Sequence, residues 1–225
     1  MAILDPEQTD GCIDEIDPPL TLPPRVRTFG FLPDEKKLLP GDLLLVSGKE
    51  RSKISNFICR SQADAGLDEI HACWHHAAIY LYDGELCEAV PIKGVRLNSL
   101  YEYVGDCRLR FRRPRLPLTD EERWKLCINA TRKLREKYSY DPLPDIYTKL
   151  KQGWWHPLSK SERRQINICS QLYANAYLAT TGKLLDPKLT GYIFPAHLSA
   201  TGAMADVELG RQRIKATPQP EHVTN

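Results

Sequence analysis

The sequence predicts an α+β domain in which an antiparallel sheet, or a half-barrel, packs against helices. Apolar or alternating stretches joined by glycine turns follow one another over residues 42–112, as in an antiparallel meander. Helix-capping residues stand at Ser52, within this region, and at Thr119 and Asn167, after it. The 225 residues are enough for one large domain, or for a domain with tails.

The strands are expected between clear turn signals. Asp83-Gly84 is a dipeptide typical of short hairpin loops, so residues 77–90 should form a β-hairpin. A run of alternating arginines could bind phosphate groups, but it is more typical of a strand whose arginines face solvent while Leu109 and Phe111 face the core. The expected strands are residues 42–47, both arms of the hairpin, 95–97 and 108–112, and the arginines are Arg108, Arg110, Arg112, Arg113 and Arg115.

Three helices are expected from their caps. Thr119 and Glu122 form a capping box, in which a threonine is followed three residues later by a glutamate. Its helix should bury the stripe Trp124, Ile128, Thr131, Leu134 and Tyr138. The Ser52 helix should place Ile54, Phe57 and Ile58 on one face, and the Asn167 helix should bury Leu172, Tyr173, Ala176 and Tyr177 and end at Gly182. Residues 98–103 are expected to form a short helix.

The domain organisation follows from composition. Residues 1–37 are rich in proline and are expected to form an extended N-terminal arm. Residues 38–200 should form the folded domain. Residues 201–225 are expected to be a C-terminal tail that is largely disordered at its end.

Charge and hydropathy narrow the function classes. The chain has 31 basic and 29 acidic residues, so no nucleic-acid partner is expected. No stretch is long and apolar enough to span a bilayer, and the acidic N-terminus does not resemble a secretory signal, so the protein is expected in the cytoplasm as made. The seven cysteines form no C-x-x-C pair, which argues against a disulfide framework and a thiolate zinc site.

Cys169, His76 and Glu88 are the candidate catalytic residues. Cys169 would lie in the first turn of the Asn167 helix, where the helix dipole and the exposed N–H groups favour a thiolate and a developing oxyanion. A cysteine nucleophile needs a base, and the base needs a third group to orient it. Glu88 stands among apolar residues, where a carboxylate must be paired. The alternative for Cys169 is an ordinary buried cysteine, and for His76 a structural histidine.

Strand parity sets a condition on this triad. With a two-residue loop at Asp83-Gly84 and a regular ladder, Glu88 and His76 would point to opposite faces of the hairpin. A three-residue loop or a β-bulge would bring them to the same face. The catalytic hypothesis therefore predicts an irregularity in this hairpin.

Four segments in this order resemble the permuted papain-like NlpC-type superfamily, and its YiiX-like branch most closely. They are PGDLLLVSG, WHHAAIYLYDGELCEAVPIKGV, ICSQLYANAY and GYIFPAHL, and the resemblance covers roughly residues 38–198. The resemblance implies a circularly permuted papain-like fold with the nucleophile at a helix N-terminus. It also implies Cys169 as nucleophile, His76 as base and Glu88 as the third polar member. Ala78 departs from the family's common glycine, and the segment 140–168 is unusually long and aromatic.

The implied function is a cysteine hydrolase, an amidase or peptidase acting through an acyl-enzyme without a cofactor. Peptide amides such as those of cell-wall peptides are the expected substrates, and a secreted antibacterial effector with an inhibitory partner protein would fit, exported by a signal-independent route. One alternative is lipid acyl hydrolysis or acyl transfer, as in the lecithin:retinol acyltransferase relatives, with Trp154-Trp155 in peripheral membrane contact. Another is a catalytically inactive papain-like binding module. Tyr80, Tyr140, Trp154 and Trp155 are the expected substrate-binding residues.

A metal site is the remaining alternative. His71 and His75 are four residues apart, a spacing that suits zinc on a helix, and Cys73 lies between them. The segment lacks a helical apolar stripe and an acidic partner. No metal is therefore expected.

Overall fold

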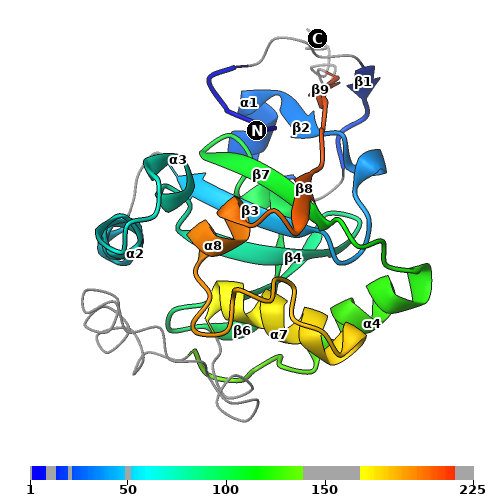
Figure 1. Cartoon of the computed structure of the whole chain (residues 1–225). Helices are drawn as coiled ribbons and strands as arrows, with labels where there is room; N and C mark the ends of the chain where they lie inside the picture. The colour runs from blue at the N-terminus through cyan, green and yellow to red at the C-terminus, as the bar shows by residue number, and fades with distance from the viewer. Residues whose placement is uncertain (1, 9–13, 20–21, 49–51, 139–167, 216–225) are drawn as a thin grey trace, which may run out of the picture.

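The computed structural model describes residues 2–8, 14–19, 22–48, 52–138 and 168–215. Its main feature is an open antiparallel sheet with the strand order β6-β5-β4-β3-β7-β8 (Figure 1). These strands are β3 (Leu43–Gly48), β4 (His76–Tyr82), β5 (Glu85–Val90), β6 (Gly94–Ser99), β7 (Cys107–Pro114) and β8 (Met204–Asp206). The α+β class and the antiparallel sheet are thus confirmed.

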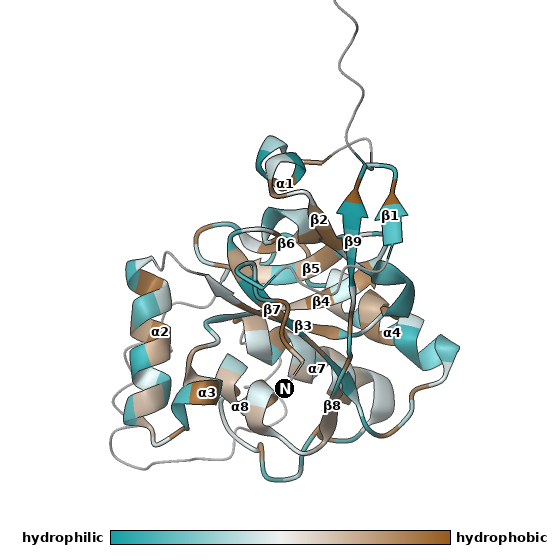
Figure 2. Ribbon diagram, turned by 90° about the horizontal axis from the view of Figure 1, so that it is seen from above, coloured by the Kyte–Doolittle hydropathy of each residue, from teal (hydrophilic) through white to brown (hydrophobic). Residues whose placement is uncertain are grey.

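Both faces of this sheet are covered, because its central strands are apolar on both sides. One face contacts helices α4 (Asp120–Thr131) and α7 (Cys169–Thr181), and its core includes Leu45, Ile79 and Cys87. The opposite face contacts the N-terminal helix α1 (Pro24–Phe29) and strand β2 (Phe31–Pro33) through Leu44, Ala78 and Phe111. Figure 2 shows the apolar colour of these central strands.

Part of the expected N-terminal arm is folded. Residues 22–38 contain α1 and β2, and β2 pairs with β9 (Arg211–Ile214) in a second sheet of order β1-β9-β2, where β1 is Asp14–Ile16. The arm is therefore not simply extended, since Val26 and Leu32 are buried against the main sheet. The expected C-terminal tail contributes β8 and β9, while residues 216–225 lie outside the described segments. The domain boundaries themselves stay predictions.

The hairpin contains the irregularity that the triad requires. Asp83 and Gly84 have positive φ angles of 49° and 72°, which is typical of a tight two-residue turn, and Tyr82 pairs with Glu85. The register then shifts between Tyr80 and Tyr82, so that Tyr80 pairs with Leu86. The structure thus has a β-bulge at this point, next to the turn, and not a three-residue loop.

Helices α2 and α4 begin where their caps predicted, but the buried face of α4 differs from the prediction. The Thr119–Glu122 capping box is present, and Ser52 accepts a hydrogen bond from the Ser55 N–H at the start of α2 (Lys53–Asp64). Helix α4 ends at Thr131 and buries Arg123, Leu126, Cys127 and Ala130, whereas Trp124 and Ile128 are each 49% exposed. On α2, Ile54 and Phe57 are 37% and 38% exposed, whereas Ile58 on the same predicted face is buried. The short helix expected over residues 98–103 is a 3₁₀ turn, Leu100–Glu102.

The arginines of β7 do not form a solvated face. Arg110 and Arg112 are each 5% exposed, and both pair with Asp206 of β8. Their guanidinium groups also donate to backbone carbonyls at the end of helix α8 (Pro195–Ala200), including that of Ser199. These arginines therefore connect the C-terminal segment to the main sheet, while Leu109 and Phe111 are buried as predicted.

Helix α7 places Cys169 at its first position. Its N-cap is Ile168, which makes no side-chain capping hydrogen bond, and Asn167 lies outside the described residues. The helix buries Leu172, Tyr173, Ala176 and Tyr177 and ends at Gly182 in the left-handed conformation, as predicted. Among the described helices, none combines the length and apolarity needed to cross a membrane.

Candidate active site

His76 and Glu88 come together on one face of the hairpin. Because of the bulge, Glu88 pairs directly with Ala78, two residues after His76 on the neighbouring strand β4. The Nε2 atom of His76 lies 2.8 Å from Oε2 of Glu88. The His76 residue is 9% exposed and Glu88 is not exposed at all, so this hydrogen bond is shielded from water.

Cys169 reaches the same histidine from α7. Its side chain is hydrogen-bonded to that of His76, and its sulfur also accepts hydrogen bonds from the backbone N–H groups of Ala77 and Ser170. Because Nε2 of His76 is occupied by Glu88, Nδ1 is the ring nitrogen available to the sulfur. The structure therefore brings the three predicted residues into one hydrogen-bonded chain.

The Glu88 carboxylate has further partners that the sequence did not reveal. Oε1 accepts a hydrogen bond from Nε of Arg96 at 3.0 Å and lies 2.8 Å from a terminal nitrogen of the same guanidinium. Oε2 accepts a hydrogen bond from the Tyr103 hydroxyl at 2.5 Å. The odd burial of Glu88 pointed to a paired carboxylate, but a single sequence does not show which arginine or tyrosine pairs with it.

The electrostatics favour an ionised pair. Burial raises the pKa of the Cys169 thiol, but the hydrogen bond and charge of His76, together with the backbone N–H groups of Ala77 and Ser170, more than offset this, so the net pKa is lowered. Burial alone would lower the pKa of His76, but hydrogen bonds to Cys169 and Glu88 raise it to about 10. Both directions favour a thiolate beside an imidazolium.

Glu88 is held in its ionised form. Burial would raise the pKa of its carboxyl, but His76, the Tyr103 hydroxyl and the Arg96 charge lower it to about 2. An ionised Glu88 can accept the His76 N–H and stabilise the imidazolium. This arrangement suits a base whose ring must keep one orientation.

Of the four expected substrate-binding residues, the structure describes Tyr80, which contacts the N-terminal segment. Tyr80 is 3% exposed, and its hydroxyl donates to Oε2 of Glu35 at 3.0 Å in the packing between the sheet and the N-terminal segment. Tyr140, Trp154 and Trp155 lie outside the described residues. Substrate contacts by these four residues stay predictions.

The histidines of the alternative metal site have other partners. Nδ1 of His71 is hydrogen-bonded to the Ser199 hydroxyl at 2.8 Å, and Nε2 of His75 accepts a hydrogen bond from the Gly48 N–H at 2.9 Å. Cys73 is hydrogen-bonded to the Ile70 carbonyl. The six cysteines in the described segments are free thiols, and five of them are outside the hydrogen-bonded chain.

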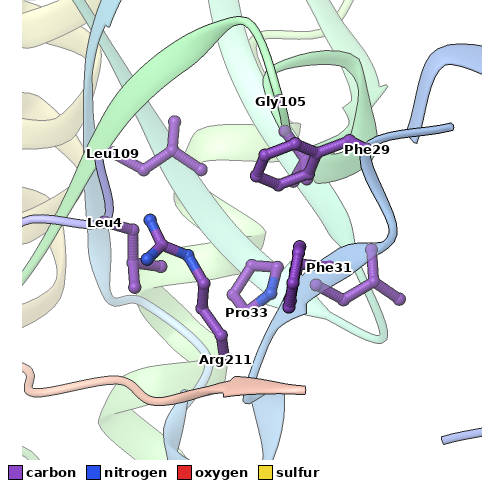
Figure 3. A pocket seen from close by; sticks show the side chains of 9 residues that line it. Leu4, Phe29, Phe31, Pro33, Gly105, Leu109 and Arg211 are labelled. Atoms are coloured by element: carbon purple, nitrogen blue, oxygen red, sulfur yellow. The ribbon is translucent and has the colours of Figure 1, made fainter. Parts of the chain in front are cut away.

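A small apolar pocket lies elsewhere in the molecule (Figure 3). Leu4, Phe29, Phe31 and Leu109 line it, between the N-terminal segment and β7. The Arg211 guanidinium stands at its side and donates to the Asp5 carbonyl. None of the triad residues lines this pocket, so the candidate chemistry and this cavity are separate.

Comparisons with known proteins show a shared fold. No family model and no curated protein matches the chain. Its structure is similar to the crystal structure of the metalloprotein YiiX from Escherichia coli O157:H7, with a TM-score of 0.52 and 17% sequence identity. The match covers 76% of this chain and 97% of YiiX. The chain therefore shares the α+β fold of YiiX over most of its length.

Proposed function

We propose that this protein is a papain-like cysteine hydrolase that cleaves an amide bond through an acyl-enzyme. The observation that carries this proposal is the buried hydrogen-bonded chain from Cys169 through His76 to Glu88. It combines a nucleophile, a base and an orienting carboxylate, which is the set that thiol catalysis needs. The resemblance of the sequence to permuted papain-like proteins assigns the same roles to the same residues.

The proposed reaction begins with attack of the Cys169 thiolate on the carbonyl carbon. The N–H groups in the first turn of α7 have no partner within the helix, since the first helical hydrogen bond is donated by Leu172 to Ile168. Of these, the Cys169 N–H is proposed to stabilise the oxyanion, while that of Ser170 donates to the sulfur. The His76 imidazolium then protonates the departing amine, and a thioester remains on Cys169.

Water completes the cycle. Neutral His76 accepts a proton from a water molecule as the oxygen attacks the thioester carbonyl. The carbon–sulfur bond breaks, the carboxylic acid product leaves, and the thiolate–imidazolium pair is restored. Glu88 orients the ring throughout and remains ionised.

We propose peptide amides, including those of cell-wall peptides, as the substrate class. This assignment is supported by the four sequence segments that resemble the permuted NlpC-type superfamily, and the YiiX-like fold is compatible with it. The lipid alternative assigned membrane contact to Trp154-Trp155, which lie outside the described residues. No described contact favours it over an amide substrate.

YiiX is named a metalloprotein, but the described residues of this chain do not suit a metal. Within the described segments, no group of three or more His, Cys, Asp or Glu side chains could hold an ion. In the triad itself, the Glu88 oxygens already accept hydrogen bonds from Arg96, His76 and Tyr103.

The proposal is tested by mass spectrometry of the intact protein after incubation with peptidoglycan-derived peptides and, separately, with phospholipid vesicles. Wild-type protein should gain the mass of a peptidyl acyl group on Cys169, and Cys169→Ala should gain none. Cys73→Ala is the matched control, because Cys73 is also a free thiol but lies outside the triad, and it should behave as wild type. A fatty-acyl adduct from vesicles alone would replace the amide assignment with lipid chemistry. Equal electrophile labelling of Cys169 and Cys73, without any adduct, would reject a hydrolase and favour a binding module.

A further inference from the structure

The Glu88 carboxylate carries more partners than the orientation of one histidine requires. We propose that Arg96 and Tyr103 are positioning residues of this site, which hold the Glu88 carboxylate ionised and fixed in orientation against the His76 imidazole. This inference rests on the proposed function and extends it. The site then contains five side chains, the triad together with Arg96 and Tyr103.

Arg96 fixes one oxygen of the carboxylate. It stands directly opposite Glu88 in the register of β5 and β6, so its guanidinium reaches the carboxylate across one strand spacing. Two of its nitrogens lie 3.0 and 2.8 Å from Oε1. Because Arg96 occupies Oε1, Oε2 is left for His76. The Arg96 side chain is 31% exposed, whereas Glu88 is fully buried. The Arg96 guanidinium therefore contacts the buried carboxylate from the partly exposed edge of the site.

Tyr103 fixes both the other oxygen and the ring. Its hydroxyl donates to Oε2, the same atom that accepts from His76. Its own ring lies beside the imidazole, with the ring centres 5.8 Å apart and the planes inclined by 39°. Burial and the neighbouring Glu88 charge raise the pKa of Tyr103, so its hydroxyl remains a donor. Tyr103 thus limits the movement of the carboxylate and of the histidine together.

The charges along this chain alternate. The His76 ring lies between the Cys169 sulfur and the Glu88 carboxylate, and the Arg96 guanidinium lies against the other oxygen of that carboxylate. The other titratable group beside Glu88 is Cys87 on the same strand, whose pKa is raised to about 12 mainly by burial, so it stays neutral. Arg96 is therefore the cation that balances Glu88 when His76 is also charged.

Loss of the Arg96 charge should make the site more negative. A thiolate forms less readily in a more negative site, and an imidazolium loses its proton less readily. The pH profile of Cys169 reactivity should have two steps, an acid step where Cys169 ionises and an alkaline step where His76 loses its proton. In Arg96→Gln both steps should move to higher pH, each by about one pH unit for the loss of one nearby positive charge. A purely structural residue would change the amount of folded protein without moving both steps in one direction.

The experiment measures the rate of Cys169 alkylation by iodoacetamide from pH 4 to pH 11 in the full-length protein, with the modified residue located by mass spectrometry. Iodoacetamide is neutral, so the rate reports the thiolate and needs no substrate. Arg96→Gln should react about tenfold more slowly than wild type below the acid step. Arg96→Lys keeps the charge, so its steps should stay within 0.3 pH units of wild type, about the limit of such a fit. Arg108→Gln is the matched control, since Arg108 also lies on a strand but donates to the Ser47 hydroxyl instead of a carboxylate.

Tyr103→Phe provides an independent arm. It removes the hydroxyl and keeps the ring, so Glu88 becomes a stronger acceptor for His76 and the alkaline step should move to higher pH. Tyr101→Phe is its control, because the Tyr101 hydroxyl donates to Glu35, a carboxylate outside the triad. If Arg96→Gln does not fold, as judged by circular dichroism, the Tyr103→Phe arm decides.

The outcomes separate this inference from the proposed function. If wild-type Cys169 does not react faster than Cys73 at any pH in this range, the proposed hydrolase function itself is rejected. If wild-type Cys169 shows the enhanced reaction at low pH but folded Arg96→Gln and Tyr103→Phe keep its profile, the hydrolase stands and the positioning role is overturned. Shifts of both steps in Arg96→Gln, with Arg96→Lys and Arg108→Gln unchanged, support the proposal.

Discussion

Replacement of Glu88 by glutamine keeps the shape of the side chain and removes its charge. In the native protein both carboxylate oxygens accept hydrogen bonds, which come from the N–H and O–H groups of His76, Tyr103 and Arg96. A glutamine amide has one oxygen and one NH₂ group. Its NH₂ group would lie against N–H or O–H groups that also donate, and no hydrogen bond could form there. The variant Glu88→Gln should therefore lose stability as well as catalytic competence.

The size of the stability loss follows from the pKa of the carboxyl. Native contacts lower it from 4.5 to about 2, and at 1.36 kcal/mol for each pKa unit this corresponds to about 3 kcal/mol. The sign follows from proton linkage. Because the folded-state pKa is the lower one, the contribution is complete above pH 4.5 and disappears as the pH falls through about 2. The difference between wild type and variant should be about 3 kcal/mol at pH 5.5 and about 1.4 kcal/mol at pH 3.

Urea unfolding, followed by circular dichroism at these two pH values, measures this difference. Glu85→Gln is the matched control, because Glu85 lies on the same strand but is exposed, and it should stay within about 0.5 kcal/mol of wild type. A Glu88→Gln variant as stable as wild type at pH 5.5 would refute the reasoning. A loss that did not shrink at pH 3 would show that packing, and not the charge, stabilises this position.

Two further pairs of substitutions test the fold. Gly94→Ala places a Cβ atom 2.3 Å from the Glu136 carbonyl oxygen at a φ of +70°, so it should lower the free energy of unfolding by at least about 2 kcal/mol in the same urea assay. Gly30 has a similar φ of +81° but open space around it, so Gly30→Ala should lower it by about 1 kcal/mol. Leu126→Ala, at a fully buried position of α4, should lower the free energy of unfolding by about 2–5 kcal/mol, and Trp124→Ala, at a position 49% exposed, by less than about 1 kcal/mol. A larger loss for Trp124→Ala than for Leu126→Ala would contradict the observed face of α4.

Features governed by neighbouring residues could be predicted from the sequence. The Asp83-Gly84 turn, the Thr119–Glu122 capping box and the end of α7 at Gly182 each depend on backbone conformations that a few adjacent residues determine. Strand parity also showed that the catalytic hypothesis needs an irregularity in the hairpin, and the structure has one. The candidate triad could be named because each of its residue types has few chemical uses.

Features that depend on distant partners could not be predicted. The alternation in β7 was read as a solvated face, but Arg110 and Arg112 are buried because Asp206, nearly a hundred residues later, lies against them. The buried face of α4 was wrong for a related reason. Its apolar stripe satisfied helical periodicity, but the packing of α4 against α7 placed Leu126 inside and Trp124 outside.

The site shows the same division. The sequence by itself determined that a thiol, an imidazole and a buried carboxylate were present and that the carboxylate needed a partner. Only the tertiary structure decided that Arg96 and Tyr103 are those partners and that Cys169 lies against the same histidine. The physical reason is that turns and caps form from contacts within a few residues. A buried charge, in contrast, is stabilised by whichever side chains the packing of separate elements brings within hydrogen-bonding distance.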